Sequence, residues 1–421
     1  MAPAIIPSRA RAQQKTLRIL QWKHFVPSYD AWFNDIYVKE WGEQNDTQVI
    51  VDNVGLGDIT NHAAAEAEPQ QGHDLVILLE PPAIHEDQVI DHREIYEECE
   101  RRYGIAPDFA IKSTYNPKTD KYFGFCNAFL PAVLTYRKDL RDAVGATPDS
   151  WDDVRRGGRQ IKLLHESPVG ISLAPEPNSN HTMRAIMYSF GSSVQDADGN
   201  PVLKSKQTLE AIKYVKALYE EAMTEEVLMW NPTSNNSFMV AGSGCLTLDT
   251  MSIVRASEKL ERPFANDLRL AKAPEGPAGR LAPSFSIATY FIWNFAKNVE
   301  GAKQFLVDYI GHTREGFLAS GFQNMPIFPD AAPDLAQLIS NDANAIPTDK
   351  YNVLAEASTW TTNVGYPGYT NAAIAEVMGR GLIPTMCAKA ATDELTPEEA
   401  LDQADTEIRR IFEEWEESGK I

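Results

Sequence analysis

Hydrophobic and polar positions along the first 80 residues predict an order of strand, helix, strand, helix and strand. Residues 17–22 alternate as a strand, and residues 49–51 form a second apolar run. Residues 73–79 (HDLVILL) are almost continuously apolar, which is typical of a strand buried in a parallel sheet. An apolar stripe at helical spacing follows Ser28, a suitable helix N-cap, and a short helix is predicted over residues 58–68. This order indicates a doubly wound α/β unit.

Two later segments have the pattern of chain crossings between two lobes. Residues 124–140 (GFCNAFLPAVLTYRKDL) and residues 284–295 (SFSIATYFIWNF) each combine an apolar, strand-like run with Gly- or Pro-rich flanks. Pro131 cannot donate to a sheet ladder, so we expect it at the start or edge of its strand. A third crossing is expected near residues 321–324. Lobes joined in this way leave a cleft between them, and clefts are the usual sites for small molecules.

The rest of the chain alternates between amphipathic helices and polar loops. The predicted helices cover residues 151–157, 182–190, 206–222, 299–310 and 397–415, and the predicted strands cover residues 170–173 and 245–248. The last helix has a capping box formed by Thr396 and Glu399. Residues 176–181 and 230–236 are predicted as polar loops. Because ligands of open α/β sheets bind beyond the carboxyl ends of the strands, such loops are candidate binding segments.

Charge and cysteine usage exclude several classes of protein. The net charge of −20, without a basic patch, argues against nucleic acid or an anionic membrane as partner. No run of about 18 apolar residues is present that would span a membrane. The four cysteines, Cys99, Cys126, Cys245 and Cys387, contain no Cys-x-x-Cys pair, so a zinc ribbon is not expected. We favour buried free thiols, and disulfides in any of three pairings are the alternative.

The motifs of common enzymes are missing as well. The chain has no G-x-x-x-x-G-K-[ST] phosphate loop, no G-x-G-x-x-G fingerprint and no G-x-S-x-G elbow. His85 and Glu86 begin an H-E-x-x-H pattern, but Val89 stands where the second histidine of a zinc site is needed. We therefore expect no catalytic residue, no metal and no cofactor. Two carboxylates that meet in space could still hydrolyse a glycan, so a glycan-processing enzyme stays open as an alternative.

Four segments spread over nearly the whole chain share the order and spacing of one family. They are residues 16–41, residues 124–140 with their Tyr-x-Lys-Asp-Leu ending, residues 236–250 (NSFMVAGSGCLTLDT), and residues 284–310 with a Lys-Asn-x-Glu-x-Ala turn. Together they resemble the extracellular solute-binding proteins of ABC importers, in particular the sugar-binding family that includes maltose-binding protein. The resemblance implies an α/β fold: a two-lobed periplasmic-binding-protein fold, class II-like, with a hinge of three chain crossings.

The resemblance also implies a domain division. We expect the first lobe to contain residues 16–127 plus 284–322, and the second lobe residues 128–283 plus 323–421. Residues 1–15 include Ala10-Arg11-Ala12, an A-x-A cleavage pattern, and we expect them to be the disordered tail of an export signal in a shortened form of the chain. The expected location is the periplasm.

Sugars are bound by amides and carboxylates that pair with hydroxyl groups and by aromatic rings that stack on C–H faces. The ligand-binding residues that we predict are Trp22, Lys23, His24, Glu80, Asn127, Phe129, Asn178, Asn180, His181, Trp230, Asn231, Asp249, Ser252, Trp360 and Tyr366. The resemblance places Lys23, Glu80, Asn180, His181, Ser252 and Tyr366 closest to the ligand. This chain departs from the family's best-known member at Ser252 and beside Phe129. That member has a stacking aromatic and a carboxylate at these positions. The difference argues against a maltodextrin as the ligand of this chain.

From these observations we expect the substrate-binding component of an ABC importer. It would capture a carbohydrate or polyol in the interlobe cleft and deliver it to the membrane permease, as a monomer and without enzymatic activity. An alternative is the same fold with a non-sugar ligand, such as an organic acid, a polyamine or a sulfonated compound. Lys23 and Arg255 are the cations to inspect first for such a ligand.

Overall fold

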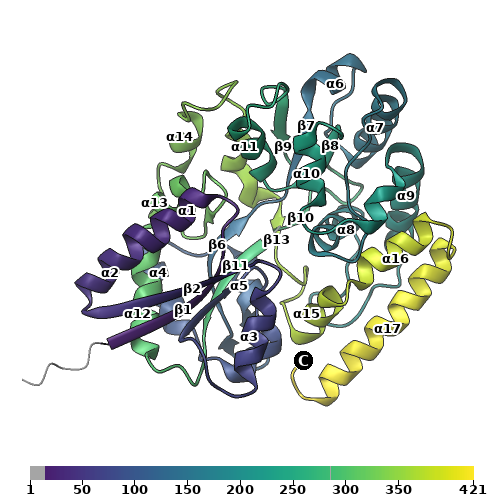
Figure 1. The fold of residues 1–421 in the computed structure, drawn as a ribbon. Coiled ribbons are helices and arrows are strands. Elements are labelled where there is room, and N and C mark those ends of the chain that lie inside the picture. Colours follow the sequence, from purple (N-terminus) through teal and green to yellow (C-terminus); the bar gives the residue numbers. More distant parts are fainter. Residues whose placement is uncertain (1–14, 285) are drawn as a thin grey trace, which may run out of the picture.

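A computed structural model describes residues 15–284 and 286–421 and shows a two-lobed α/β protein (Figure 1). The first lobe is built on a six-stranded sheet with the order β12-β6-β11-β3-β1-β2, and the second on a three-stranded antiparallel sheet with the order β8-β7-β9. The A-x-A pattern of the predicted export tail lies outside the described residues. The predicted fold class is confirmed.

The first lobe contains the strands predicted at residues 17–22, 49–51 and 73–79. Its strands are β1 (Lys15–Trp22), β2 (Thr47–Val54), β3 (Leu75–Leu78), β6 (Phe125–Leu130), β11 (Ser286–Ile292) and β12 (Met325–Pro326). Its helices are α1 (Pro27–Trp32), the π-helical turn η1 (Phe33–Tyr37), α2 (Val38–Gln44), α3 (Ile59–Ala67), α4 (Arg93–Tyr103), α5 (Asp108–Thr114), α12 (Val299–Ile310) and α13 (Thr313–Ala319). Strand β1 runs parallel to β2 and β3, so their carboxyl ends meet at one edge of the sheet.

The second lobe wraps helices around its small sheet. Its strands are β7 (Val133–Arg137), β8 (Leu246–Asp249) and β9 (Leu268–Ala271). The helices of the rest of the chain are α6 (Lys138–Ala143), α7 (Trp151–His165), α8 (Pro177–Ser189), α9 (Lys206–Ala222), α10 (Ser234–Ala241), α11 (Ser252–Lys259), α14 (Leu335–Ser340), α15 (Ala372–Gly379), α16 (Leu382–Ala391) and α17 (Pro397–Glu417). The capping box predicted at Thr396 and Glu399 is present at the start of α17.

Short elements connect these units. They are the strands β4 (Tyr115–Asn116), β5 (Lys121–Tyr122), β10 (Ala282–Pro283) and β13 (Thr361–Thr362), and the 3-10 turns η2 (Ala83–Gln88), η3 (Glu225–Met229), η4 (Pro329–Ala331) and η5 (Asn352–Thr359). Strand β6 ends at Leu130 and β7 begins at Val133, so the chain changes sheet at Pro131 and Ala132. Strand β12 still pairs with β6. We therefore propose lobe boundaries a few residues after those predicted at 127/128 and 322/323.

Helix α8 begins five residues earlier than predicted, and this correction matters for the site. Residues 176–181 were predicted as a polar loop, but residues 177–181 are the first turn of α8. The Glu176 carboxylate accepts hydrogen bonds from the backbone N–H groups of Asn178 and Ser179 (both 2.8 Å), and Pro177 occupies the first helical position. Asn and Ser have low helix propensity, so the local sequence did not predict this first turn. The Glu176 cap sets the start of the helix.

Other local predictions were wrong at element ends. Helix α7 continues to His165 instead of ending at residue 157. Gly157 and Gly158 lie inside this helix because they allow close packing: a Cβ on Gly158 would lie 2.5 Å from Val169. Ser28 does not cap α1, since Val26 is the N-cap residue and the Ser28 hydroxyl donates to the Ala319 carbonyl (2.7 Å). The strand predicted over residues 170–173 is only an isolated bridge at Val169.

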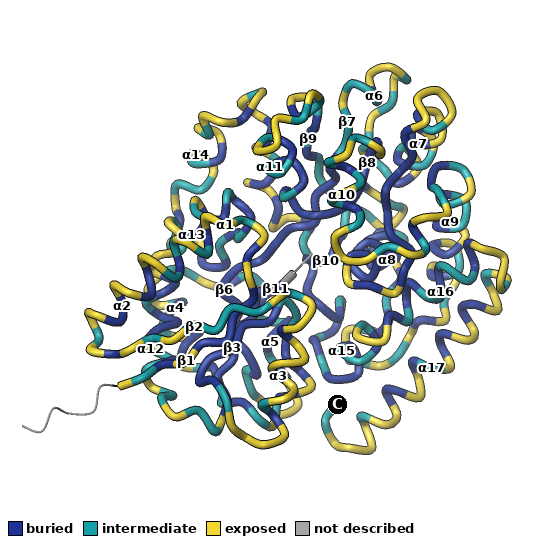
Figure 2. Tube along the Cα trace, viewed as in Figure 1, coloured by how far each residue is buried: buried dark blue, intermediate teal, exposed yellow. Residues whose placement is uncertain are grey.

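The interior follows the strands of both sheets (Figure 2). Cys99, Cys126, Cys245 and Cys387 are all buried and free, which confirms the prediction of buried thiols over disulfides. Burial raises the pKa of the Cys99 thiol to about 12, so this group stays protonated and unreactive at neutral pH.

His92 is a buried neutral histidine and makes the protein sensitive to acid. Its Nδ1 hydrogen bonds to the Tyr122 carbonyl (2.9 Å), and its Nε2 accepts from the backbone N–H of Ile292 (3.0 Å). Burial lowers the pKa of His92 to about 4. The folded state therefore binds fewer protons than the unfolded state between about pH 6.5 and 4, and the stability present above that window is lost as the pH falls through it.

We expect the His92→Asn variant to be less stable than the native protein at pH 7.5 but to lose less stability on acidification. The difference in slope should approach about 1.4 kcal/mol per pH unit between pH 6 and 5. Urea unfolding at several pH values measures this, and the exposed His62 provides the control variant His62→Asn. Identical slopes for the native and His92→Asn proteins would contradict the prediction.

Candidate functional site

A cavity of about 1000 Å³ lies between the two lobes. The first lobe contributes the loop of residues 25–28 after β1, together with residues 321 and 322, and the second contributes Ser252 and Arg255 of α11. Residues 334–344 form a third wall that includes the amides of Gln337, Asn341 and Asn344. Aromatic rings and amides in one cavity of this size suit a polar small molecule.

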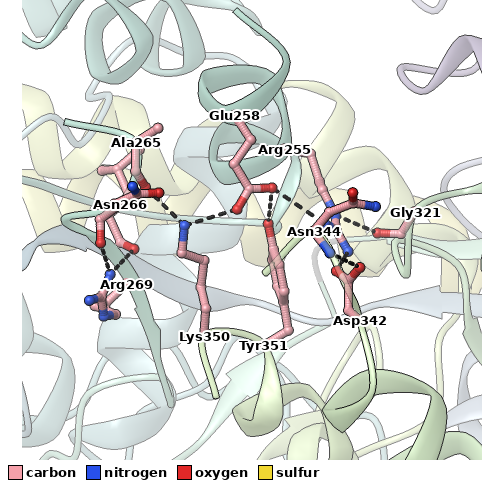
Figure 3. Close-up of polar contacts among 11 residues, drawn as sticks. Arg255, Glu258, Ala265, Asn266, Arg269, Gly321, Asp342, Asn344, Lys350 and Tyr351 are labelled. Atoms are coloured by element: carbon pink, nitrogen blue, oxygen red, sulfur yellow. Dashed lines mark hydrogen bonds and ion pairs between the residues drawn. The ribbon is translucent and has the colours of Figure 1, made fainter. Parts of the chain in front are cut away.

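Arg255 joins the two lobes beside this cavity (Figure 3). Its guanidinium pairs with Asp342 (2.6 Å) and Glu258 (3.3 Å) and donates to the Gly321 carbonyl (3.3 Å). The same group lies 4.9 Å from the ring centre of Phe322. The Arg255 charge is therefore compensated within the protein, and this cation is not available for an anionic ligand.

Buried amides form a network along the second-lobe side of the cleft. Asp249, at the end of β8, accepts hydrogen bonds from Asn235 and from Asn236 (3.0 Å to the Asn236 Nδ2), and Asn178 donates to the Asn235 Oδ1 (2.9 Å). Ser252 donates to the Asn236 Oδ1 (3.2 Å). The network links the predicted residues Asn178, Asp249 and Ser252. Burial raises the pKa of Asp249 to about 7, against the hydrogen bonds that favour its charged form.

Glu80 and His181 make a direct contact across the lobes. The Glu80 Oε1 lies 3.2 Å from the His181 Nε2, and the Arg184 Nη2 donates to the His181 Nδ1 (3.0 Å). Because arginine has only donors, Nδ1 must accept, which places the imidazole proton on Nε2, facing Glu80. Tyr366 packs against Tyr188 nearby (ring centres 5.2 Å apart), and both Arg184 and Glu80 are close enough to Tyr188 to influence its pKa.

His24 and Trp22 lie at the carboxyl end of β1. The two rings stack with centres 5.0 Å apart, and both residues are buried. The His24 Nδ1 accepts from the Val26 N–H (2.9 Å) and its Nε2 bonds to the Asn324 Oδ1 (3.1 Å). Burial lowers the pKa of His24 to about 4, so it is a neutral hydrogen-bonding group at neutral pH. Lys23 between them is exposed.

The structure does not bring every predicted residue into one place. Trp360 is only 1% exposed and its indole N–H donates to the Ala132 carbonyl (2.9 Å). Phe129 is buried against Phe109, and Asn127 is buried in β6. These three residues are packed in the interior of the protein in this structure.

The loop before α10 holds two further predicted residues in local contacts. Asn231 is exposed, and its Oδ1 accepts from the Thr233 N–H (3.0 Å) just ahead of α10. Trp230 is half-buried against Phe238, with ring centres 5.1 Å apart. Among the residues that we predicted, Ser252 alone lines the cavity of about 1000 Å³.

Several residues at the lobe junction were not predicted. Arg184, Asn235 and Asn236 belong to the networks just described, and Phe25 and Phe322 line the cavity. Arg184 follows Asn180 and His181 by four and three positions, so it would share their helical face once α8 is known to begin at residue 177. Arg184 could therefore have been predicted only if the start of α8 at residue 177 had been recognised.

Comparison with known proteins shows which sequences part of this chain is similar to. Residues 108–310 match the family model of bacterial extracellular solute-binding proteins. A binding protein of Brucella abortus (strain 2308) is 27% identical over 108 residues, which is 25% of this chain and only 26% of that relative. No helix within residues 15–284 and 286–421 is long and apolar enough to cross a membrane.

Solved structures share the fold over 94% of the chain. A sugar transporter protein of Arthrobacter chlorophenolicus A6 with bound laminaribiose has a TM-score of 0.75 at 16% identity, covering 94% of this chain and 99% of that chain. Maltose-bound MalE3 of T. maritima has a TM-score of 0.75 at 15% identity, over 94% and 99%. A ribitol complex from Agrobacterium radiobacter K84 has a TM-score of 0.74 at 15% identity, over 94% and 98%.

At these identities the structural likeness concerns the fold, and the family model supplies the relationship in sequence. The match covers the first crossing, most of the second lobe and the return to the first lobe. Together with the two-lobed fold, the match over residues 108–310 makes this chain similar to the bacterial extracellular solute-binding proteins.

Proposed function

We propose that this protein is the substrate-binding component of an ABC importer, which captures a carbohydrate or polyol between its lobes and delivers it to the membrane permease. The observation that carries the proposal is the cavity of about 1000 Å³ at the lobe junction, with aromatic rings and amides in its walls. Hydroxyl groups both donate and accept, so they pair with amides and serine, while rings cover the apolar faces of a sugar. Laminaribiose, maltose and ribitol are bound by proteins of this fold.

The arrangement couples binding to closure because each lobe supplies different walls. Phe25 and Phe322 belong to the first lobe, and Ser252 belongs to the second. A ligand that contacts both sides gains interactions that exist only when the lobes are together, so it shifts the population toward the closed form. We propose that the permease recognises this closed form, and that the protein acts as a monomer in the periplasm.

The composition of the cavity favours a ligand without net positive charge over a polyamine. Arg255 is paired with Asp342, and Arg314 is paired with Asp334 (3.0 Å), so the acidic groups of the lining already have partners. The glycan-processing alternative is disfavoured because the family consists of non-enzymatic transport components. Chromatography of the ligand after prolonged incubation tests this, and recovery of the unchanged ligand is the expected result.

A thermal-shift screen tests the proposed ligand class. With a sugar or polyol at about 100 times its dissociation constant, we expect a stabilisation of about 2.7 kcal/mol and a rise of a few degrees in the melting temperature. Amino acids and polyamines should give no shift. A shift caused only by amines or amino acids would overturn the proposed ligand class.

A variant that fills the cavity makes the screen specific for this site. Ser252→Trp places an indole in the cavity and is expected to abolish the shift caused by the best sugar while the ligand-free melting temperature stays within a few degrees. Ser418→Trp, at an exposed position just after α17 and outside the cavity lining, is the control and should keep the full shift. Equal shifts in both variants would place the ligand elsewhere.

A further inference from the structure

Arg184 is a buried arginine at the lobe junction, and it forms no ion pair with a carboxylate among residues 15–284 and 286–421. The residue is 2% exposed, its Nε donates to the Asn180 carbonyl (3.3 Å), and its Nη2 donates to the His181 Nδ1. Its Nη1 has no hydrogen-bond partner among the residues that the structure describes. Two other cations near the junction do have carboxylates: the buried Lys350 with Glu258 (2.9 Å) and the half-buried Arg255 with Asp342 (2.6 Å). An uncompensated buried charge is costly, so Arg184 requires an explanation.

The position of Arg184 supplies that explanation. His181 separates its guanidinium from Glu80 of the first lobe, through contacts of 3.0 Å and 3.2 Å. Glu80 follows β3 by two residues, at the carboxyl edge of the parallel strands where α/β proteins bind their ligands. The His181 ring thus lies between the Arg184 guanidinium and Glu80 of the first lobe. While the lobes are together, the contact between Glu80 and His181 covers Arg184.

Two acceptor atoms beside Arg184 also lack partners within the described part of the chain. The Glu80 Oε2 is buried without a hydrogen bond. The Asn180 amide donates to the Met378 carbonyl (2.9 Å), but its Oδ1 accepts nothing. The cluster therefore offers one charged donor and two acceptors in one place. A group that fits must bring a negative charge for Arg184 and hydroxyl groups for Glu80 and Asn180.

We propose that the preferred ligand is an acidic carbohydrate, an aldonate or uronate, whose carboxylate binds Arg184. Its neighbouring hydroxyl groups donate to the Glu80 Oε2 and the Asn180 Oδ1. The planar guanidinium can bind a carboxylate through two parallel hydrogen bonds, which is the strong and specific pairing for this group. A neutral sugar would satisfy the two acceptors and leave the Arg184 charge uncompensated. The inference rests on the proposed function and concerns the same lobe junction, at residues that lie outside the lining of the cavity of about 1000 Å³.

Arg141 provides an internal comparison. It is 1% exposed, and its Nη1 donates to the Asp153 carbonyl (3.1 Å), but it lies inside the second lobe under α7. A Cβ on Gly157 would overlap its guanidinium. Arg141 is therefore enclosed by its own lobe, away from the contact between Glu80 and His181, and it makes no contribution to ligand recognition.

The test is calorimetric titration of the full chain with matched pairs of ligands. Lactobionate is compared with lactose, maltobionate with maltose, D-gluconate with D-glucitol, and D-galacturonate with D-galactose. We expect at least one acid to bind about ten- to a hundredfold more tightly than its neutral partner, because a hydrogen bond to a charged group adds that much. Arg184→Gln should remove the preference and Arg184→Lys should weaken it, while Arg141→Lys should leave it unchanged.

Each outcome decides the inference. If the neutral partners bind the native protein as tightly as the acids, or if a folded Arg184→Gln variant keeps the preference, the acidic-carbohydrate inference is overturned and the proposed carbohydrate function stands. If Arg184→Gln does not fold, the acid-to-neutral ratio of the native protein decides alone. If no member of any pair binds, both the inference and the proposed function fail.

Discussion

Replacement of Glu258 by alanine is expected to lower the free energy of unfolding by about 3–5 kcal/mol. The Glu258 carboxylate accepts from the Lys350 Nζ (2.9 Å), the Tyr351 hydroxyl (2.7 Å) and Arg255 (3.3 Å), as Figure 3 shows. The Lys350 side chain is fully buried, and its other contact is the neutral Ala265 carbonyl (2.9 Å). Without Glu258 the buried ammonium of Lys350 loses its counter-charge, which is among the most destabilising single changes in a folded protein.

Urea unfolding at pH 7 measures the effect. In the Glu258→Ala background, the further change Lys350→Met should cost little or restore stability, since it removes the charge that was left unpaired. Glu261→Ala, at an exposed position two residues beyond α11, is the control and should change stability by less than about 0.5 kcal/mol. A loss below about 1 kcal/mol for Glu258→Ala would show that water reaches Lys350.

The strands at the start of the chain could be predicted from local pattern, because a strand buried on both faces leaves a continuous apolar run. The run at residues 73–79 became β3, and the alternating residues 17–22 became most of β1. Helix ends were less predictable, since they depend on tertiary contacts: Gly157 and Gly158 lie inside α7 because Arg141 and Val169 leave no room for a side chain.

The candidate binding segments were chosen from strand ends and residue types, which do not reveal the pairing among their side chains. Glu80 and His181 stand 101 positions apart, and no local signal brings them to 3.2 Å. Trp360 is a residue type that often stacks on sugars, yet its indole N–H donates to the Ala132 carbonyl in the interior of the protein. Arg184 was missed because the preceding residues resemble a loop, whereas the Glu176 cap makes them helical.

Replacement of Asp249 by alanine is expected to lower stability by about 3 kcal/mol and the affinity for the best sugar of the screen by about a hundredfold. Asp249 holds three donors, the side chains of Asn235 and Asn236 and the backbone N–H of Thr250, and all would lose their acceptor in the interior. The same network positions Ser252 on the cavity wall. Calorimetry and urea unfolding measure the two effects, and Asp267→Ala in the loop before β9 is the control. If a folded Asp249→Ala variant binds the sugar with unchanged affinity, the network of Asp249 does not take part in ligand binding.

The variant Asp249→Asn separates the charge of this side chain from its packing. Burial raises the pKa of Asp249 to about 7, so the folded state binds more protons than the unfolded state between about pH 4 and 7. Ionisation of Asp249 therefore costs stability as the pH rises through that window, whereas asparagine has no such cost. We expect the stability of Asp249→Asn relative to the native protein to improve by about 1.4 kcal/mol per pH unit between pH 5 and 7 and to level off above pH 7. A difference that does not change with pH would mean that the three donors keep Asp249 ionised throughout, because their hydrogen bonds outweigh its burial.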